Sequence, residues 1–340
     1  MDVDDQLIGL IEGDYVETVE GLLFSVKGLH HPEGLVIAYL RYVPDSNGNR
    51  KRGSRSYRRV YDLDETDDFL RKHFPPYLNP IESKGLTLQS LPEDRIIRVY
   101  SPREHLRALE KPLSELEATT VKFASVLSVE SGVPLDKLGV SGSILIGLAG
   151  PTSDVDLVVY GIDAGLKVYD ALKRLRVGRG WIRPYDPETV KGVVWNRWGD
   201  ARLDPERMAI IENRKVLHGL VDGRDYFVRL VRRPAEFERE VASRPLGKVV
   251  IRGTVVDAVN SIFTPCTYHI EDCTFVNHSM EVEVTQLVSY RGKFTEQAVD
   301  GDPVEARGTL EGVIYKDRTV HRLMLGAKSD YLVPTCLMDR

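Results

Sequence analysis

The sequence predicts an α+β protein of several domains: an α+β accessory domain over residues 1–112, an α/β core with a mixed sheet over residues 113–240, and a small β-barrel over residues 245–340. Three observations predict this class. Strand-like and helix-like segments mix in the first third, they alternate in the middle, and almost every apolar run after residue 245 is strand-like. At 340 residues the chain is long enough for two or three hydrophobic cores.

The first third contains four runs rich in β-branched and aromatic residues, which predict strands at residues 21–29, 34–43, 56–63 and 95–101. Short helices are expected near residues 67–74 and 103–110. Turn-forming residues separate the runs, so an α+β accessory domain is expected. No motif in this segment indicates its chemistry.

The central third begins with a predicted helix over residues 113–132, which Gly132 ends. An Asp-Gly pair at Asp222 and Gly223 separates two apolar runs and predicts a hairpin. Between these lie a short strand at residues 137–140, a Ser-Gly-Ser turn at 141–143 and a short helix at 143–150. A strongly apolar strand at 154–161 and another helix at 164–176 follow. A mixed sheet with helices follows from this order.

The last third consists almost entirely of predicted strands, at residues 248–256, 267–272, 280–290, 303–315 and 319–328. Glycines interrupt two of them, at Gly253 and Gly308, and glycine permits the sharp coiling of long strands in a small barrel. The pattern resembles an oligonucleotide/oligosaccharide-binding (OB) fold.

Charge is unevenly distributed along a chain whose formal net charge is −5. Residues 167–233 hold 16 Lys and Arg against 9 Asp and Glu, whereas residues 245–340 hold 10 against 13. A second basic cluster without an acid consists of Arg50, Lys51, Arg52, Arg55, Arg58 and Arg59. Such clusters suit an anionic substrate, and they are equally typical of solvated faces.

Nothing in the sequence predicts a membrane span or a signal peptide, and three cysteines are too few for a disulfide framework. We therefore expect a cytoplasmic protein without a membrane partner. Cys266, His269, Cys273 and His278 offer thiol and imidazole ligands of the kind zinc accepts, but their spacing matches no common zinc motif, and structural roles are the alternative.

The segment Gly139–Gly161 concentrates the residues that predict chemistry. Asp154 and Asp156 are two residues apart on a strand, so both side chains project from one face. Two adjacent carboxylates repel each other unless a cation neutralises them, and Mg²⁺ combines such carboxylates with phosphate oxygens. The alternatives are an inactive relic or structural acids.

Upstream, Ser141, Gly142 and Ser143 join a strand to the start of a helix. Free backbone N–H groups at such a turn bind phosphate, glycine allows close approach, and we expect Ser143 to cap the helix. An ordinary helix cap is the alternative. A phosphate-binding turn beside a carboxylate pair predicts a site for a nucleoside triphosphate with Mg²⁺.

The chain has a Gly-Ser turn followed, after about ten residues, by an Asp-x-Asp strand. This pattern resembles that of the DNA polymerase β-like nucleotidyltransferase superfamily, and Gly147 and Ser153 also fit it. The chain is similar to archaeal-type nucleotidyltransferases with an OB-like C-terminal domain. The motif spans about 23 residues in a core of about 120. The resemblance implies two Mg²⁺ ions and a third carboxylate on a later strand.

Asp225 is the candidate third carboxylate, with Asp222 second, although both could simply serve the hairpin turn. Relatives often carry a basic residue after the Gly-Ser turn, whereas this chain has Ile144 and Leu145. Phosphate charge would then be neutralised from elsewhere, for which the candidates are Arg214, Lys215 and Arg229.

The resemblance implies transfer of a nucleoside monophosphate from a nucleoside triphosphate to an acceptor hydroxyl. The OB-like segment and the basic runs favour RNA over DNA as the acceptor. A protein hydroxyl, as in AMP-transferring relatives, is the alternative enzyme reaction. A nucleic-acid-binding protein that only senses nucleotide with an inactive core is the rival from another class.

Overall fold

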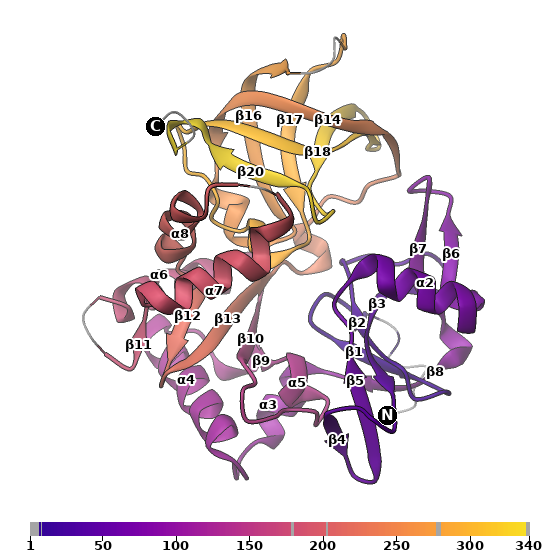
Figure 1. Ribbon diagram of the computed structural model, residues 1–340, viewed down its shortest axis with the longest axis vertical. Helices are drawn as coiled ribbons and strands as arrows, with labels where there is room; N and C mark the ends of the chain where they lie inside the picture. The colour runs from indigo at the N-terminus through magenta and orange to yellow at the C-terminus, as the bar shows by residue number, and fades with distance from the viewer. Residues whose placement is uncertain (1–6, 8, 178–179, 202, 277–279, 338–340) are drawn as a thin grey trace. The chain divides into compact units, whose positions relative to one another are not determined.

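The computed structural model describes the chain except for residues 1–6, 8, 178–179, 202, 277–279 and 338–340. The described residues form an α+β fold of seven α-helices and 20 strands, divided into two compact units (Figure 1). The first unit comprises residues 1–81, 86–168 and 224–237, and the second comprises residues 82–85, 169–223 and 238–340. The units cut across the domain boundaries predicted from the sequence.

An antiparallel sheet in the order β4-β5-β3-β2-β1-β8 forms the N-terminal part of the first unit, and β7 pairs with both β3 and β6. The predicted strands and both predicted helices are confirmed. The element bounds are β1 Tyr15–Thr18, β2 Leu23–Val26, β3 Leu35–Pro44, β4 Arg50–Arg52, β5 Arg55–Arg59, α2 Leu63–His73, β6 Leu78–Ile81, β7 Leu86–Pro92, β8 Ile96–Tyr100 and α3 Pro102–Ala108.

The predicted core elements follow in the expected order: α4 Glu115–Ser131, β9 Leu138–Val140, α5 Gly142–Leu145, β10 Val155–Tyr160, α6 Ile162–Leu175, β12 His218–Val221 and β13 Arg224–Val231. Gly132 ends α4, as predicted, and adopts the left-handed conformation. Strand β10 is antiparallel to β9 and parallel to β13, so the mixed sheet is confirmed. Asp222 and Gly223 both have positive φ angles, as a tight hairpin turn requires.

The second unit contains a barrel of strands. Strand β14 pairs with β16 along one edge and with β18 along the other, and β17 and β19 complete the circuit. All five predicted strands are present, and the bounds are β14 Ala242–Asp257, β15 Phe263–Thr264, β16 Cys266–Phe275, β17 Val284–Ser289, β18 Pro303–Ile314, β19 Thr319–Met324 and β20 Tyr331–Pro334. A β-carbon on Gly308 would lie 2.7 Å from the carbonyl oxygen of Met324, so close strand contact requires this glycine.

Two helices of the second unit, α7 Pro187–Trp198 and α8 Pro205–Arg214, were not predicted from the sequence. Each begins with an Asp N-cap followed by proline, at Asp186 and Asp204. Both helices pack on the barrel core through Val194, Trp198, Met208 and Ile211. The two-residue strand β11, Ile182–Arg183, pairs with β12. No helix in the described part of the chain is long and apolar enough to cross a membrane.

Candidate active site

The acidic pair lies at the N-terminal end of β10, an interior strand of the sheet. Val155, Leu157 and Val158 are fully buried, whereas Asp156 is partly buried and Asp154, just before the strand, is exposed. Alternation along the strand therefore turns both carboxylates away from the apolar core. This arrangement is the one predicted from the sequence.

The register of β13 brings the third predicted acid to the same face. Val155 pairs with Tyr226 and Asp156 with Phe227, which places Asp225 beside Asp154, one residue earlier on each strand. Because neighbours in a parallel sheet share a face, Asp154, Asp156 and Asp225 lie on one face. Among the described residues, however, no three Asp, Glu, His or Cys side chains converge into a ready-formed metal-binding group.

The Ser-Gly-Ser turn lies directly against Asp156. The Ser141 N–H donates to the Asp156 carbonyl over 2.9 Å, and Gly142 has a φ of +63°. A β-carbon on Gly142 would overlap the Asp156 carboxylate oxygen Oδ2 and lie 2.9 Å from its Cγ. Glycine is therefore required here both by backbone conformation and by space.

The helix after this turn differs from the prediction. Helix α5 has only four residues, its N-cap residue is Ser141, and no side chain caps it. The Ser141 hydroxyl instead donates to the Gly13 carbonyl over 2.7 Å, and Ser143 is buried. The expectation that Ser143 caps the helix is wrong. A single turn has little dipole, so any phosphate affinity here comes from individual N–H groups.

The charge environment of Asp156 is mixed. Burial and the neighbouring Asp154 carboxylate raise the pKa of Asp156 to about 6, while Arg229 and Arg59 act in the opposite direction. Repulsion between like charges is the condition that a bound cation relieves. Of the three cations predicted to neutralise phosphate, Arg229 alone belongs to the unit that holds the acidic pair.

Arg229 is held in place by contacts within the first unit. Its guanidinium donates to Oε1 of Glu12 over 2.9 Å and lies 4.8 Å from the centroid of the Phe227 ring. Glu12 is buried and also accepts from Lys27 over 2.5 Å and from the Gly28 N–H over 3.1 Å. This buried carboxylate fixes Arg229 on the face of β13 that carries Asp225.

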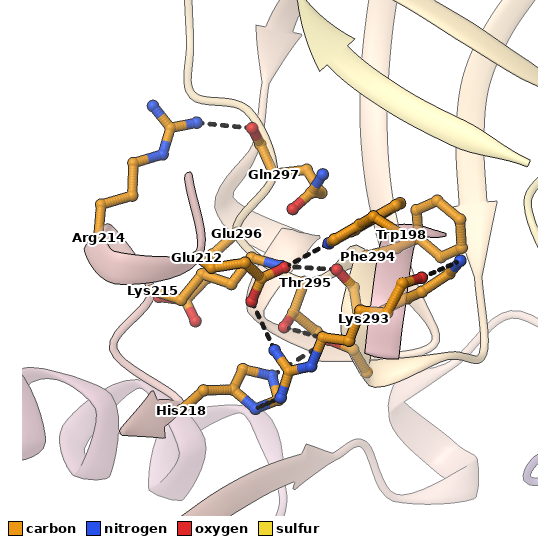
Figure 2. Close-up of polar contacts among 12 residues, drawn as sticks. Trp198, Glu212, Arg214, Lys215, His218, Lys293, Phe294, Thr295, Glu296 and Gln297 are labelled. Atoms are coloured by element: carbon orange, nitrogen blue, oxygen red, sulfur yellow. Dashed lines mark hydrogen bonds and ion pairs between the residues drawn. The ribbon is translucent and has the colours of Figure 1, made fainter. Parts of the chain in front are cut away.

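Lys215 and Arg214 belong to a different environment, in the second unit (Figure 2). The Lys215 ammonium is fully buried and donates to Glu212 over 3.0 Å and to the Lys293 carbonyl over 2.6 Å. Arg214 donates to the Gln297 carbonyl over 2.6 Å. These contacts link α8 to the segment 292–297, and the predicted role of both residues in nucleotide binding stays a prediction.

The same network satisfies other buried groups of the second unit (Figure 2). Glu212 also accepts from Trp198 Nε1 over 2.7 Å and from Arg197 over 2.6 Å. Glu296 accepts from the N–H groups of Val216 and Leu217 over 2.7 and 3.0 Å. Buried charges that are paired in this way stabilise one arrangement of the surrounding elements.

The cysteine and histidine series does not form a zinc site in the described residues. Cys266, His269 and Cys273 all lie on β16, where Cys266 is buried in the barrel core, Cys273 packs against the same core beyond a bulge at Asp272, and His269 is partly buried. His278 lies outside the described residues.

Comparison with known proteins yields one relative. An uncharacterized protein of Methanocaldococcus jannaschii, MJ1086, is 30% identical over 317 residues, which covers 89% of this chain and 91% of that protein. The chain belongs to the family of MJ1086. No model of a known protein family matches the chain, and no solved structure matches it significantly. Membership of this family therefore does not indicate an activity.

In this MJ1086 family member, sequence reasoning missed the residues that the N-terminal sheet brings to the acidic pair. Ile144 and Leu145 are buried, and Leu145 packs with Tyr15, Tyr42, Tyr57 and Tyr100 of that sheet. Arg59, on β5 of the same sheet, is close enough to lower the pKa of Asp156. The basic cluster at residues 50–59, which contains no acid, could have indicated these residues. No local sequence pattern, however, places that cluster near residue 156.

Proposed function

We propose that the protein transfers a nucleoside monophosphate from a nucleoside triphosphate to an acceptor hydroxyl. The observation that carries the proposal is the shared face of Asp154, Asp156 and Asp225, set by the β10–β13 register, beside a turn whose glycine touches Asp156. Asp154 and Asp156 are neighbouring carboxylates, one of them partly buried, and such carboxylates repel each other unless a cation neutralises them. Their arrangement suits a triphosphate that carries divalent cations.

The donor set fits Mg²⁺, which binds through one or two carboxylates and completes its shell with water and phosphate oxygens. Asp154 and Asp156 would hold the ions, and Asp225 would complete the site from the neighbouring strand. When bound, two such ions would neutralise the phosphates and lower the barrier at both the attacking and the leaving oxygen. Burial, followed by the Asp154 charge, raises the pKa of Asp156, and a bound cation would relieve the repulsion between the two carboxylates.

The chain's own residues would align the reactants. The backbone at Gly142 would approach the phosphates closely, and Arg229 would offset their charge from the same sheet face. Asp225 would accept the proton of the acceptor hydroxyl as its oxygen bonds to the α-phosphorus. The bond from the α-phosphorus to the bridging oxygen would break, and pyrophosphate would leave with that electron pair. Alignment and charge neutralisation would supply most of the rate.

The barrel supports RNA as the acceptor. We take it to be an OB fold, because five strands close a circuit in which β17 runs parallel to β19 while the other pairs are antiparallel. Folds of this kind bind single strands along a groove. Residues 167–233 hold 16 basic and 9 acidic residues, and this basic excess suits a polyanion, although residues 245–340 carry a slight acidic excess.

The test is transfer of label from each α-³²P nucleoside triphosphate, with Mg²⁺, to total RNA and to a protein extract offered together. Label on RNA that disappears in Asp154→Asn/Asp156→Asn protein supports the proposal in full. Label on a protein band keeps the reaction and replaces the acceptor. Mg²⁺-dependent nucleotide binding without any transfer would instead assign the protein as an inactive nucleotide sensor.

A further inference from the structure

The N-terminal sheet presents two guanidinium groups near the acidic pair. Arg59 ends β5 and pairs in register with Tyr42 of β3. It shares a face of β5 with Tyr57, two residues earlier, which is buried in the cluster that contains Leu145. The face that carries Arg59 is therefore the face that packs on the segment following the Ser-Gly-Ser turn.

Aromatic rings hold the Arg59 side chain. Its Cζ lies 4.1 Å from the ring centroid of Tyr61 and 5.9 Å from that of Tyr42. Tyr61 is 58% exposed, so this guanidinium is stacked on a ring that is open to solvent. Stacking fixes the direction of a guanidinium while leaving its N–H groups available to an anion.

Arg50, on β4, reaches the loop that leads into Asp154. One of its terminal nitrogens donates to the Ser153 hydroxyl over 3.0 Å, and that hydroxyl also accepts from the Gly150 N–H over 2.8 Å. A β-carbon on Gly150 would lie 3.2 Å from Cζ of Arg50. Arg224, at the start of β13, holds the same loop by donating to the Pro151 carbonyl over 2.7 Å.

Neighbouring arginines of the cluster are already paired with acids. Arg52 pairs with Glu17 over 2.6 Å, and Arg58, on the opposite face of β5, pairs with Glu65 over 2.6 Å. Within the described part of the chain, neither Arg50 nor Arg59 lies within ion-pair distance of a carboxylate, although both are partly buried and the charge of Arg59 acts on Asp156. A partly buried cation without a carboxylate partner is suited to bind an anionic ligand.

We propose that Arg50 and Arg59 bind the triphosphate of the nucleotide, so that the N-terminal sheet forms the cationic half of the site. This inference rests on the proposed function, whose acidic half is Asp154, Asp156 and Asp225. It accounts for an apolar residue, Leu145, after the turn, because Leu145 packs on the sheet that supplies the charge. It also gives residues 1–112 a role in substrate binding.

The test is calorimetric binding of a non-hydrolysable α,β-methylene ATP analogue with Mg²⁺ to the full chain. Charge-assisted hydrogen bonds to phosphate predict that Arg59→Ala and Arg50→Ala each raise Kd roughly ten- to a hundredfold. Inorganic tripolyphosphate should compete for the wild-type site and bind both variants correspondingly weakly. Arg58→Ala and Lys51→Ala remove the same charge from the opposite faces of β5 and β4, and should leave Kd within about threefold.

Three outcomes separate the inference from the proposed function. Weakened binding in Arg59→Ala and Arg50→Ala, with both controls unchanged, supports the inference. Wild-type affinity in both variants overturns the inference and leaves the acidic half standing. A wild-type protein that binds no nucleotide overturns both. If Arg59→Ala unfolds at a lower temperature than the wild type, the nucleotide affinities of Arg50→Ala, on the three-residue strand β4, and of the charge-retaining Arg59→Lys test the inference instead.

Discussion

A β-carbon on Gly142 would overlap Oδ2 of Asp156, so the Ser-Gly-Ser turn and the acidic strand are in van der Waals contact through a glycine. The turn and the acid are 14 positions apart in sequence, and the antiparallel pairing of β9 with β10 brings them together. The turn therefore cannot change without displacing the carboxylate.

Gly142→Ala should abolish nucleotide binding because the carboxylate must move, and it should also cost about 1–2 kcal/mol for an L-residue at positive φ. Gly147→Ala is the matched control, since Gly147 has a φ of +67° but its nearest neighbour is Arg52 Cδ at 3.6 Å. Urea denaturation should report a similar loss of stability in both variants. Calorimetry should show a loss of nucleotide binding in Gly142→Ala alone. Equal nucleotide affinity in both variants would contradict the contact described here.

Asp156→Asn should remove Mg²⁺-dependent nucleotide binding without lowering thermal stability. The side chain is partly buried beside Asp154, and a neutral amide of the same shape removes the repulsion between them. The melting temperature in EDTA at pH 8 should equal or exceed that of the wild type. A clear loss of stability would mean that the carboxylate has a structural partner and would argue against a metal ligand.

Asp14→Asn should make stability less sensitive to pH. Burial raises the pKa of Asp14 to about 7 from an ordinary value of 3.8. The Ile11 N–H and the Arg103 charge lower this pKa, whereas the charges of Glu104 and Glu12 raise it further. The folded state thus binds this proton more tightly, so the stabilisation is complete below pH 4 and lost as pH rises to about 7.

The neutral amide that replaces the Asp14 carboxyl cannot ionise, so the variant should gain stability relative to the wild type between pH 5 and pH 8. Urea midpoints at the two pH values measure this gain. Asp163→Asn is the control, because Asp163 is exposed and pairs with Lys167 at the surface. A stability difference between Asp14→Asn and wild type that is independent of pH would show that Asp14 is not buried as described.

Lys215→Met should destabilise the second unit by about 3–5 kcal/mol, because it leaves the buried Glu212 carboxylate without one of its partners. Lys191→Met, which breaks an exposed pair with Glu188, should cost less than about 1 kcal/mol. Chemical denaturation measures both. At temperatures where Lys215→Met is folded, its nucleotide affinity should be unchanged. A selective loss of affinity would support the predicted role of Lys215 in nucleotide binding.

Three features of the fold that local sequence patterns specify were predicted correctly. The apolar run after Asp154 predicted β10, the left-handed Gly132 predicted the end of α4, and Asp222-Gly223 predicted the hairpin turn. Each depends on residues that are close in sequence, through periodicity, capping or turn conformation.

Two helices and the long-range contacts were missed. Helices α7 and α8 carried an Asp-Pro start signal at Asp186 and Asp204 that could have predicted them. No local pattern could have placed Arg59 near Asp156 or buried Lys215 against Glu212, because sheet packing across about 100 residues decides the first and tertiary packing on the barrel decides the second.

Pyrophosphate release is the most direct measurement of the central claim that Asp154, Asp156 and Asp225 form a nucleotidyl-transfer site. Purified protein would be incubated with each nucleoside triphosphate, Mg²⁺ and total RNA, beside Asp154→Asn, Asp156→Asn and Asp225→Asn variants of verified fold. We expect release by the wild type with at least one nucleotide, and a loss of at least a hundredfold, about 2.7 kcal/mol, in each variant. Release that persists in all three variants, or is absent from the wild type with every nucleotide, would contradict it.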